Sequence, residues 1–205
     1  MQFFKVLRYE VQGTLRVIQI YMVMEVCGGI NAKAMFKTEY ATEEKAKVIV
    51  KQVVFGAQAL HKAGIYHKDL KSSNWMLQAE SLKLKIIDFG LAVDSNDRAS
   101  SLLAQGYHPP EAYGPGDYQP SRVDIWQIGV ALYSILFGRK PFGMDSFDND
   151  IEHYKTNLRD LKYYFPTEIS EELQDFFKKI FVYEEERITL AQMLQHPWLA
   201  NVVTP

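Results

Sequence analysis

The chain has 205 residues, of which 47% are hydrophobic and 13% aromatic, and this size predicts one domain with a sizeable core. The formal net charge is −2 at pH 7, so no global field favours nucleic acid or an anionic membrane surface as a partner. The single cysteine, Cys27, excludes an intrachain disulfide and argues against a cysteine-based zinc site.

Neither a signal peptide nor a membrane span is predicted. The N-terminus lacks a basic region followed by a long apolar one. The longest apolar stretch, around residues 125–137, is interrupted by Gln127, Gly129 and Ser134 and falls short of the roughly 20 residues that cross a bilayer. We therefore expect an intracellular protein, in the cytoplasm and with the nucleus left open.

The first third of the chain predicts a hairpin and then a long helix. Residues 3–11 and 15–26 are rich in β-branched and aromatic residues, and Gln12-Gly13-Thr14 between them is typical of a tight turn. Thr42 is a suitable N-cap for a helix over Glu43–Lys62, in which apolar residues recur at helical spacing.

The rest of the chain predicts two short strands followed by helices. The strands are expected at Trp75–Leu77 and Leu82–Ile87. A polar and flexible segment then runs from Asp88 to about Glu111. Helices are expected at Ser121–Phe137, near Phe147–Leu158, at Glu171–Phe181 with Ser170 as its cap, and at Leu190–Gln195.

Two aspartates and an asparagine carry the chemistry. Asp69 and Asn74 share one polar loop, and Asp88 follows the second short strand. Oxygen atoms of an Asn and an Asp are suitable ligands for Mg²⁺, which uses few protein carboxylates and several substrate phosphate oxygens. An uncoordinated Asp69 beside Lys71 can then accept a proton from a hydroxyl while the ammonium neutralises a moving phosphoryl group. This arrangement indicates phosphoryl transfer.

The order of these residues resembles the eukaryotic protein kinase family. The run His67-Lys68-Asp69-Leu70-Lys71-Ser72-Ser73-Asn74 is similar to the family's H-R-D-L-x-x-x-N loop, and Asp88-Phe89-Gly90 is similar to its D-F-G motif. The lysine two positions after the aspartate resembles the serine/threonine type. The resemblance implies that Asp69 is the catalytic base and that Lys71 contacts the γ-phosphate. It further implies that Asn74 and Asp88 hold Mg²⁺.

Further landmarks follow in the family's order. Tyr107-His108-Pro109-Pro110-Glu111 is similar to the Y-x-A-P-E that closes the activation segment, and the resemblance implies that Glu111 pairs with Arg187. Asp124-Ile125-Trp126-Gln127-Ile128-Gly129 is similar to the D-x-W-x-x-G of the central helix, whose aspartate braces the catalytic loop. Upstream, residues 21–29 are similar to the fifth strand and hinge. Met24 is then the gatekeeper, and the backbone of Glu25, Val26 and Cys27 lies against adenine.

The resemblance implies an α+β, protein-kinase-like fold with two unequal parts. Residues 1–26 are expected to hold residual small-lobe strands and the start of the hinge, and residues 27–205 a mainly α-helical large lobe. The family's G-x-G-x-x-G loop, strand lysine and paired helix glutamate have no counterpart here, and Lys5 is a weak substitute. Because an isolated hairpin is marginal in water, we expect a partner chain or a missing segment to cover its apolar side chains.

Smaller departures concern substrate and regulation. Lys68 replaces the usual arginine of the catalytic loop and loses its bidentate fork. The pair Ser72-Ser73 replaces a common Pro-Glu, which removes a carboxylate that attracts basic substrates in some relatives, so a preference for basic substrates is not supported.

Two functions of different classes follow. The preferred one is a serine/threonine kinase that transfers the γ-phosphate of ATP to a protein hydroxyl with Mg²⁺. The alternative is a pseudokinase-like binding or scaffold module that lacks turnover because the Gly-rich loop and strand lysine are missing. A phosphotransferase acting on a small molecule is a third, weaker hypothesis, which the similarity to the activation segment disfavours.

Overall fold

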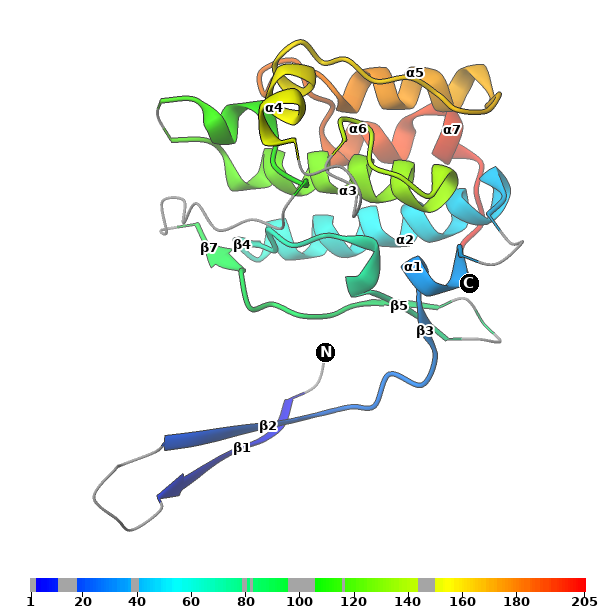
Figure 1. Cartoon of the computed structure of the whole chain (residues 1–205). Helices are drawn as coiled ribbons and strands as arrows, with labels where there is room; N and C mark the ends of the chain where they lie inside the picture. The colour runs from blue at the N-terminus through cyan, green and yellow to red at the C-terminus, as the bar shows by residue number, and fades with distance from the viewer. Residues whose placement is uncertain are drawn as a thin grey trace.

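The computed structural model describes residues 3–10, 18–37, 41–78, 81, 83–95, 106–115, 117–143 and 150–205, with side chains from residue 25 onward. The strands are β1 (Phe3–Glu10), β2 (Ile18–Met24), β3 (Ile30–Asn31), β4 (Ile65–Tyr66), β5 (Trp75–Leu77), β6 (Leu84–Ile86) and β7 (Val93–Asp94). The helices are α1 (Ala32–Met35), α2 (Glu43–Lys62), α3 (Pro120–Phe137), α4 (Ile151–Arg159), α5 (Glu171–Ile180), α6 (Leu190–Gln195) and α7 (Pro197–Ala200), with 3₁₀ turns η1 (Ser72–Asn74) and η2 (Pro110–Tyr113) (Figure 1).

The predicted hairpin is present as β1 and β2, which pair antiparallel in a register that ends with Glu10 opposite Ile18. The strand β2 ends at Met24, so the expected extension of this strand to Val26 is wrong. The reason is a tertiary contact: Glu25 forms an ion pair with Lys85 of β6, and the next residue, Val26, is 91% exposed. The expected turn at residues 12–14 and the side chains of the hairpin lie outside the described residues.

Helix α2 has the bounds that its sequence predicts. The Thr42 hydroxyl accepts a hydrogen bond from the backbone N–H of Lys45 at 3.4 Å, which satisfies one of the unpaired donors of the first turn. Six of its apolar residues fall on one stripe and are fully buried, as the spacing requires of a helix that packs on a core, whereas Phe55 is exposed. The buried residues are Ala46, Ile49, Val50, Val53, Val54 and Ala57.

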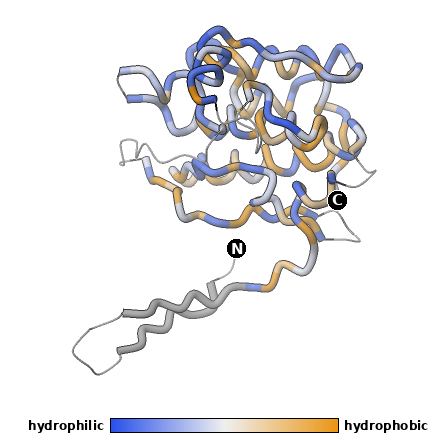
Figure 2. Tube along the Cα trace, in the orientation of Figure 1, coloured by the Kyte–Doolittle hydropathy of each residue, from blue (hydrophilic) through white to orange (hydrophobic). Residues whose placement is uncertain are grey.

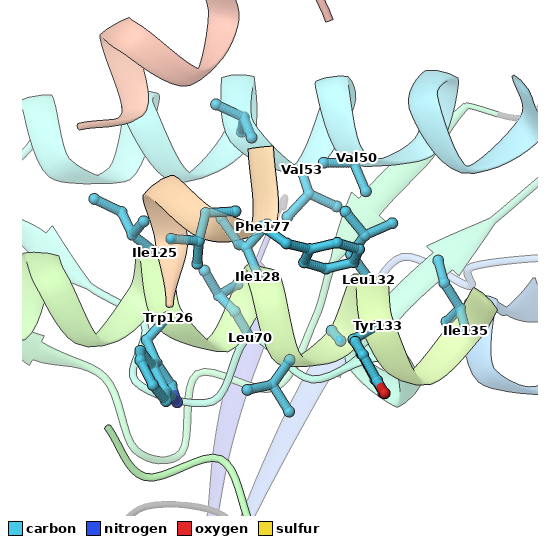
Figure 3. Packing of buried hydrophobic residues seen from close by; sticks show 14 of the residues in the cluster. Val50, Val53, Leu70, Ile125, Trp126, Ile128, Leu132, Tyr133, Ile135 and Phe177 are labelled. Atoms are coloured by element: carbon cyan, nitrogen blue, oxygen red, sulfur yellow. The ribbon is translucent and has the colours of Figure 1, made fainter. Parts of the chain in front are cut away.

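Helix α3 runs through the centre of the core. It begins at Pro120, one residue before the predicted Ser121, because proline is well suited to the first helical position, where no N–H partner is needed. Residues 123–133 are all buried, which explains why this helix is apolar on every side rather than amphipathic. It ends at Gly138, whose φ of 68° is left-handed and suits glycine. Figure 3 shows side chains of α2, α3 and α5 meeting in the resulting cluster.

Two small sheets lie at the edge of the helices. One has the order β3-β5-β6, and its β5 and β6 lie where the sequence predicts strands, although β6 begins at Leu84 and Leu82 lies outside the described residues. The other pairs β4 with β7 and was not expected, because each strand has only two residues. Val93 and Asp94 are therefore held beside Ile65 and Tyr66, the two residues before the polar loop.

The C-terminal helices pack on the two long helices: α5 lies against α3, whereas α6 and α7 lie against α2. The Ser170 hydroxyl caps α5 as predicted, and Thr189 and Gln192 form a reciprocal capping box on α6. Helix α4 begins at Ile151, capped by Asp150, and the expected start near Phe147 lies outside the described residues. Figure 2 shows hydrophilic residues frequent along the outside of this part and hydrophobic ones in its interior. Among the described helices, none is long and apolar enough to cross a membrane.

Candidate active site

A buried aspartate of α3 holds the start of the polar loop. Asp124 is fully buried, and its carboxylate accepts hydrogen bonds from the backbone N–H groups of His67 at 3.0 Å and Lys68 at 2.7 Å. The imidazole of His61, at the end of α2, lies 2.7 Å from the same carboxylate. The predicted bracing of the loop backbone by Asp124 is therefore confirmed. The contribution of His61 was missed, because His61 and Asp124 are 63 residues apart in sequence.

Gln127, one helical turn further along α3, holds the loop from the other side. Its side-chain oxygen accepts the N–H of Leu70 at 2.8 Å, and its amide nitrogen donates to the carbonyl of Lys68 at 2.7 Å. Lys68 has a left-handed φ of 60°, a conformation that costs a residue with a side chain about 1–2 kcal/mol. The N–H and the carbonyl of Lys68 are therefore both hydrogen-bonded to side chains of α3. These bonds hold Lys68 in its left-handed conformation, directly before Asp69.

The two carboxylate oxygens of Asp69 have different surroundings. One of them, Oδ2, accepts hydrogen bonds from Lys71 Nζ at 2.7 Å and Asn74 Nδ2 at 2.9 Å. The other, Oδ1, is buried and has no hydrogen-bond partner among the described residues. The side chain of Asp69 is 4% exposed, so water does not readily satisfy this atom. The arrangement fixes the carboxylate by one oxygen and leaves the other as an acceptor.

Asn74 connects this loop to the strand that precedes Asp88. Its amide nitrogen donates to both the carbonyl and the carboxylate of Asp69, and its backbone carbonyl accepts the N–H of Ile87 at 3.0 Å. Asp88 follows directly, with a left-handed φ of 65° and an exposed side chain whose Oδ1 accepts the N–H of Gly90 at 3.3 Å. The structure thus brings Asp69, Lys71 and Asn74 together and holds the backbone before Asp88 against Asn74.

His67 forms a second connection between the two motifs. Its Nε2 lies 3.1 Å from the carbonyl of Ile87, and its Nδ1 lies 3.3 Å from the N–H of Asp69. Because a carbonyl only accepts and an N–H only donates, both contacts are satisfied by the neutral imidazole protonated on Nε2. Burial lowers the pKa of His67, although the charges of Asp124, Asp69 and Asp88 act in the opposite direction. Its ring also packs on Phe89, with ring centroids 4.7 Å apart.

The predicted hinge residues lie in the connection between β2 and β3. Met24 is the last residue of β2, and Glu25 is anchored by Lys85 with an N–O distance of 2.5 Å. Cys27 is half-buried. At Gly29 the chain passes so close to β5 that a Cβ there would lie 1.8 Å from the carbonyl oxygen of Leu77. Glycine is therefore required where the connection enters the helical part.

The donor set at the site fits magnesium better than a softer metal. Among the described residues, no group of three or more His, Cys, Asp or Glu side chains is arranged to hold a metal ion. An amide oxygen of Asn74 and a carboxylate of Asp88 are hard oxygen donors, which suits an ion that keeps several waters or phosphate oxygens as further ligands. With the amide nitrogen of Asn74 committed to Asp69, its side-chain oxygen is the atom that remains for a cation.

The predicted pairing of Glu111 with Arg187 is confirmed. The guanidinium of Arg187 donates to both carboxylate oxygens of Glu111, at 2.5 and 3.0 Å, and to the carbonyls of Ile180, Val182 and Arg122. Arg187 is 2% exposed and stacks over the ring of Trp126 at 4.8 Å. This buried fork anchors η2, at the end of the segment that follows Asp88, to the loop between α5 and α6.

Comparisons with known proteins agree with this geometry. A family model described as the protein kinase domain matches residues 11–199. The chain is 30% identical over 188 residues to sperm motility kinase 2B of Mus musculus, an alignment that covers 89% of this chain and 38% of that protein.

Two Arabidopsis thaliana proteins are also similar to the chain. The SNF1-related protein kinase catalytic subunit alpha KIN12 is 31% identical over 199 residues, which cover 95% of this chain and 39% of that protein. The serine/threonine-protein kinase TOUSLED is 35% identical over 196 residues, which cover 87% of this chain and 28% of that protein. The chain therefore spans less than two fifths of the length of these three relatives. With a family match over most of its residues, the chain belongs to the eukaryotic protein kinase family.

Proposed function

We propose that this chain transfers the γ-phosphate of ATP to a serine or threonine hydroxyl of a protein substrate, in the presence of Mg²⁺. The observation that carries this proposal is the asymmetry of the Asp69 carboxylate. Its Oδ2 is held by Lys71 and Asn74, while the buried Oδ1 has no partner among the described residues. A fixed acceptor of this kind is what a general base needs to orient a hydroxyl and take its proton.

Each of the neighbouring residues has a role in this proposal. Lys71, with its ammonium 2.7 Å from Asp69, balances negative charge on the phosphoryl group as it moves to the hydroxyl. Asn74 and Asp88 are the residues that would hold Mg²⁺. Bound Mg²⁺ neutralises charge on the β- and γ-phosphate oxygens. His67, neutral and tied to Ile87, keeps the Asp69 loop in place relative to Asp88.

The adenine site is proposed at the connection between β2 and β3. Backbone groups of Glu25, Val26 and Cys27 face adenine in this proposal, and Met24 is the gatekeeper. The ion pair from Glu25 to Lys85 supports it, because this contact directs the Glu25 side chain onto β6 and leaves the backbone of the connection to face adenine. In the same reading, residues 1–26 belong to the small lobe and residues 27–205 form the large lobe.

The test separates nucleotide binding from transfer. We expect the full chain to phosphorylate serine or threonine peptides with radiolabelled ATP and Mg²⁺, and peptides with tyrosine far less. Asp69→Asn should lower kcat by roughly 10²–10⁴-fold, because it removes the proton acceptor and preserves the side-chain shape. The control Asp160→Asn changes a surface carboxylate that contacts only Arg159 and Lys162 among the described residues, and it should retain full activity.

Thermal melting supplies the second arm. Mg·ATP should raise the melting temperature of the wild type and of Asp69→Asn, because a ligand that binds only the native state stabilises it. Asp88→Asn should lose this increase. Transfer that survives Asp69→Asn would overturn the assignment of the base. A chain that neither transfers phosphate nor gains stability from Mg·ATP would support the alternative of a scaffold without turnover.

A further inference from the structure

A groove of about 380 Å³ lies between α4 and the end of η2. Helix α4 supplies one wall, Pro110 and Tyr113 of η2 supply the other, and Tyr183 from the segment after α5 also lines the groove. Among the described residues of this lining, none is proposed above for nucleotide binding or phosphate transfer. The volume is within the range of ligand sites in proteins. The groove is therefore a candidate for a second binding site.

Hydrogen bonds fix the walls of this groove. The Tyr183 hydroxyl donates to the carbonyl of Arg159 at 2.7 Å, which ties the segment after α5 to the last residue of α4. Tyr154 of α4 is 2% exposed, and its hydroxyl donates to the carbonyl of His108 at 3.2 Å. The rings of Tyr154 and Tyr113 also meet edge to face, with their centroids 6.3 Å apart. The groove is therefore preformed, and a ligand does not have to order it on binding.

Two tyrosine rings offer apolar surface to the groove. Tyr113 is 43% exposed and Tyr183 is 45% exposed. The Tyr183 hydroxyl is already bonded to Arg159, and the Tyr113 hydroxyl is hydrogen-bonded with Tyr154. Because their polar ends have partners inside the protein, these two rings are suited to contact with an apolar side chain.

Arg159 and Lys155 give the groove a surplus of positive charge. They lie one helical turn apart on α4, and the one lining carboxylate, Glu152, is 2.9 Å from Lys155. Arg159 uses only its Nε, 3.1 Å from Asp160, and Asp160 is shared with Lys162. The two terminal nitrogens of Arg159 have no partner among the described residues, and the side chain is 72% exposed. A guanidinium in this state can bind a carboxylate through two parallel hydrogen bonds.

We propose that this groove between α4 and η2 is a docking site for a segment of a partner protein that carries an apolar side chain between carboxylates. The apolar side chain packs on the rings of Tyr113 and Tyr183, and a carboxylate binds Arg159. A basic segment is repelled by Arg159 and Lys155. The small groove makes this a weak, transient complex. The inference goes beyond the proposed function, because this binding needs neither Mg·ATP nor Asp69.

The experiment measures the binding of three synthetic peptides to the full chain without nucleotide. The fluorescein-labelled peptides carry Glu-Glu-Phe-Glu-Glu, Lys-Lys-Phe-Lys-Lys or Glu-Glu-Ala-Glu-Glu between short Gly-Ser ends, and fluorescence anisotropy gives their Kd. We expect the acidic phenylalanine peptide to bind roughly fivefold more tightly than either of the others, since it alone satisfies both the rings and the guanidinium.

Variants locate this binding in the groove. Arg159→Glu should weaken the binding of the acidic phenylalanine peptide roughly tenfold, and Lys155→Glu roughly fivefold. Tyr183→Ser should reduce the difference between the phenylalanine and alanine peptides. The matched control is Lys33→Glu, which makes the same charge change on an exposed residue of α1, outside the groove, and should keep the wild-type Kd. Circular dichroism confirms that each variant is folded.

The outcomes separate this inference from its rivals. Equal binding of the three peptides, no binding of the acidic phenylalanine peptide, or a loss by Lys33→Glu as large as by Arg159→Glu would overturn it. Sedimentation velocity examines a second copy as the occupant, and a wild-type dimer that Arg159→Glu dissociates would overturn it as well. Asp69→Asn should bind the peptides as the wild type does, so a failure of the proposed kinase activity leaves the docking site untouched.

Discussion

The catalytic loop and the hinge are held by opposite means. Asp124 and Gln127 of α3 are both fully buried, and they bind the backbone of the loop at four points with hydrogen bonds of 2.7–3.0 Å. The hinge has one described side-chain anchor, the ion pair of Glu25 with Lys85, whose side chains are 31% and 38% exposed. Buried hydrogen bonds are costly to break, whereas exposed ion pairs contribute little. The proposed phosphoryl-transfer end of the site is therefore held far more firmly than the proposed adenine end.

The largest effect is expected from Asp124→Ala, which leaves the N–H groups of His67 and Lys68 buried without acceptors. Each unsatisfied group costs about 1–3 kcal/mol, so the free energy of unfolding should fall by roughly 2–6 kcal/mol in urea denaturation. The control Asp160→Ala removes a surface carboxylate and should leave this free energy within the error of measurement. An equal decrease in the free energy of unfolding for both variants would contradict the stabilising role of the Asp124 hydrogen bonds.

A smaller loss is expected from Gln127→Met, which has nearly the same volume but cannot hydrogen-bond Leu70 or Lys68. We expect the free energy of unfolding to fall by about 1–3 kcal/mol, mainly for the buried N–H of Leu70, because an under-satisfied carbonyl is tolerated more readily than an orphaned N–H. The left-handed Lys68 should relax as well, so kcat should fall more than the KM for ATP changes. A variant with normal kcat and lower stability would show that Gln127 supports the fold and not the position of Asp69.

Lowering the pH tests how protonation of His67 affects stability, without mutating the side chains that hydrogen-bond the loop backbone. The pKa of His67 in the folded state is lowered by burial, so the folded protein resists a proton that the unfolded chain accepts below about pH 6.5. Stability should therefore decrease as the pH falls through and below this value. His108 acts in the same direction, because its pKa is lowered too. Denaturation of the wild type and of His67→Gln between pH 7.5 and 5.5 should show a shallower decrease in the variant.

The smallest effect is expected at the hinge. Glu25→Gln breaks the ion pair with Lys85 at an exposed position, and the free energy of unfolding should not change measurably. If the hinge serves ATP, the KM for ATP should rise while kcat stays the same. A loss of stability as large as that of Gln127→Met would show that the hinge is as firmly held as the catalytic loop and would remove the contrast between them.

Local features of the structure could be predicted from the sequence alone, whereas contacts between distant residues could not. The sequence predicts helix α2 over Glu43–Lys62 with Thr42 as its cap, because a cap and a stripe of apolar residues are local signals. The pairs from Asp124 to His67 and from Glu111 to Arg187 became predictable only through the resemblance to a family, since each joins distant parts of the chain. The contact of His61 with Asp124 gave no such signal.

The misplaced end of β2 and the missed β7 have physical reasons of their own. Val26 has high strand propensity, but its neighbour Glu25 turns to Lys85, and an ion pair between residues 60 positions apart cannot be derived from propensity. The strands β4 and β7 have two residues each, which is too short for any alternation of polar and apolar residues to be visible. Tertiary contacts decided both cases.

The bidentate ion pair between Glu111 and Arg187 restricts which substitutions this sequence can accept during evolution. Either residue alone cannot be exchanged for an uncharged one without leaving its partner's charge buried, which typically costs about 3–5 kcal/mol. Neutral drift at position 111 is thus coupled to position 187, 76 residues away. The two positions should vary together or not at all among descendants of this gene, even where the stretches between them diverge freely.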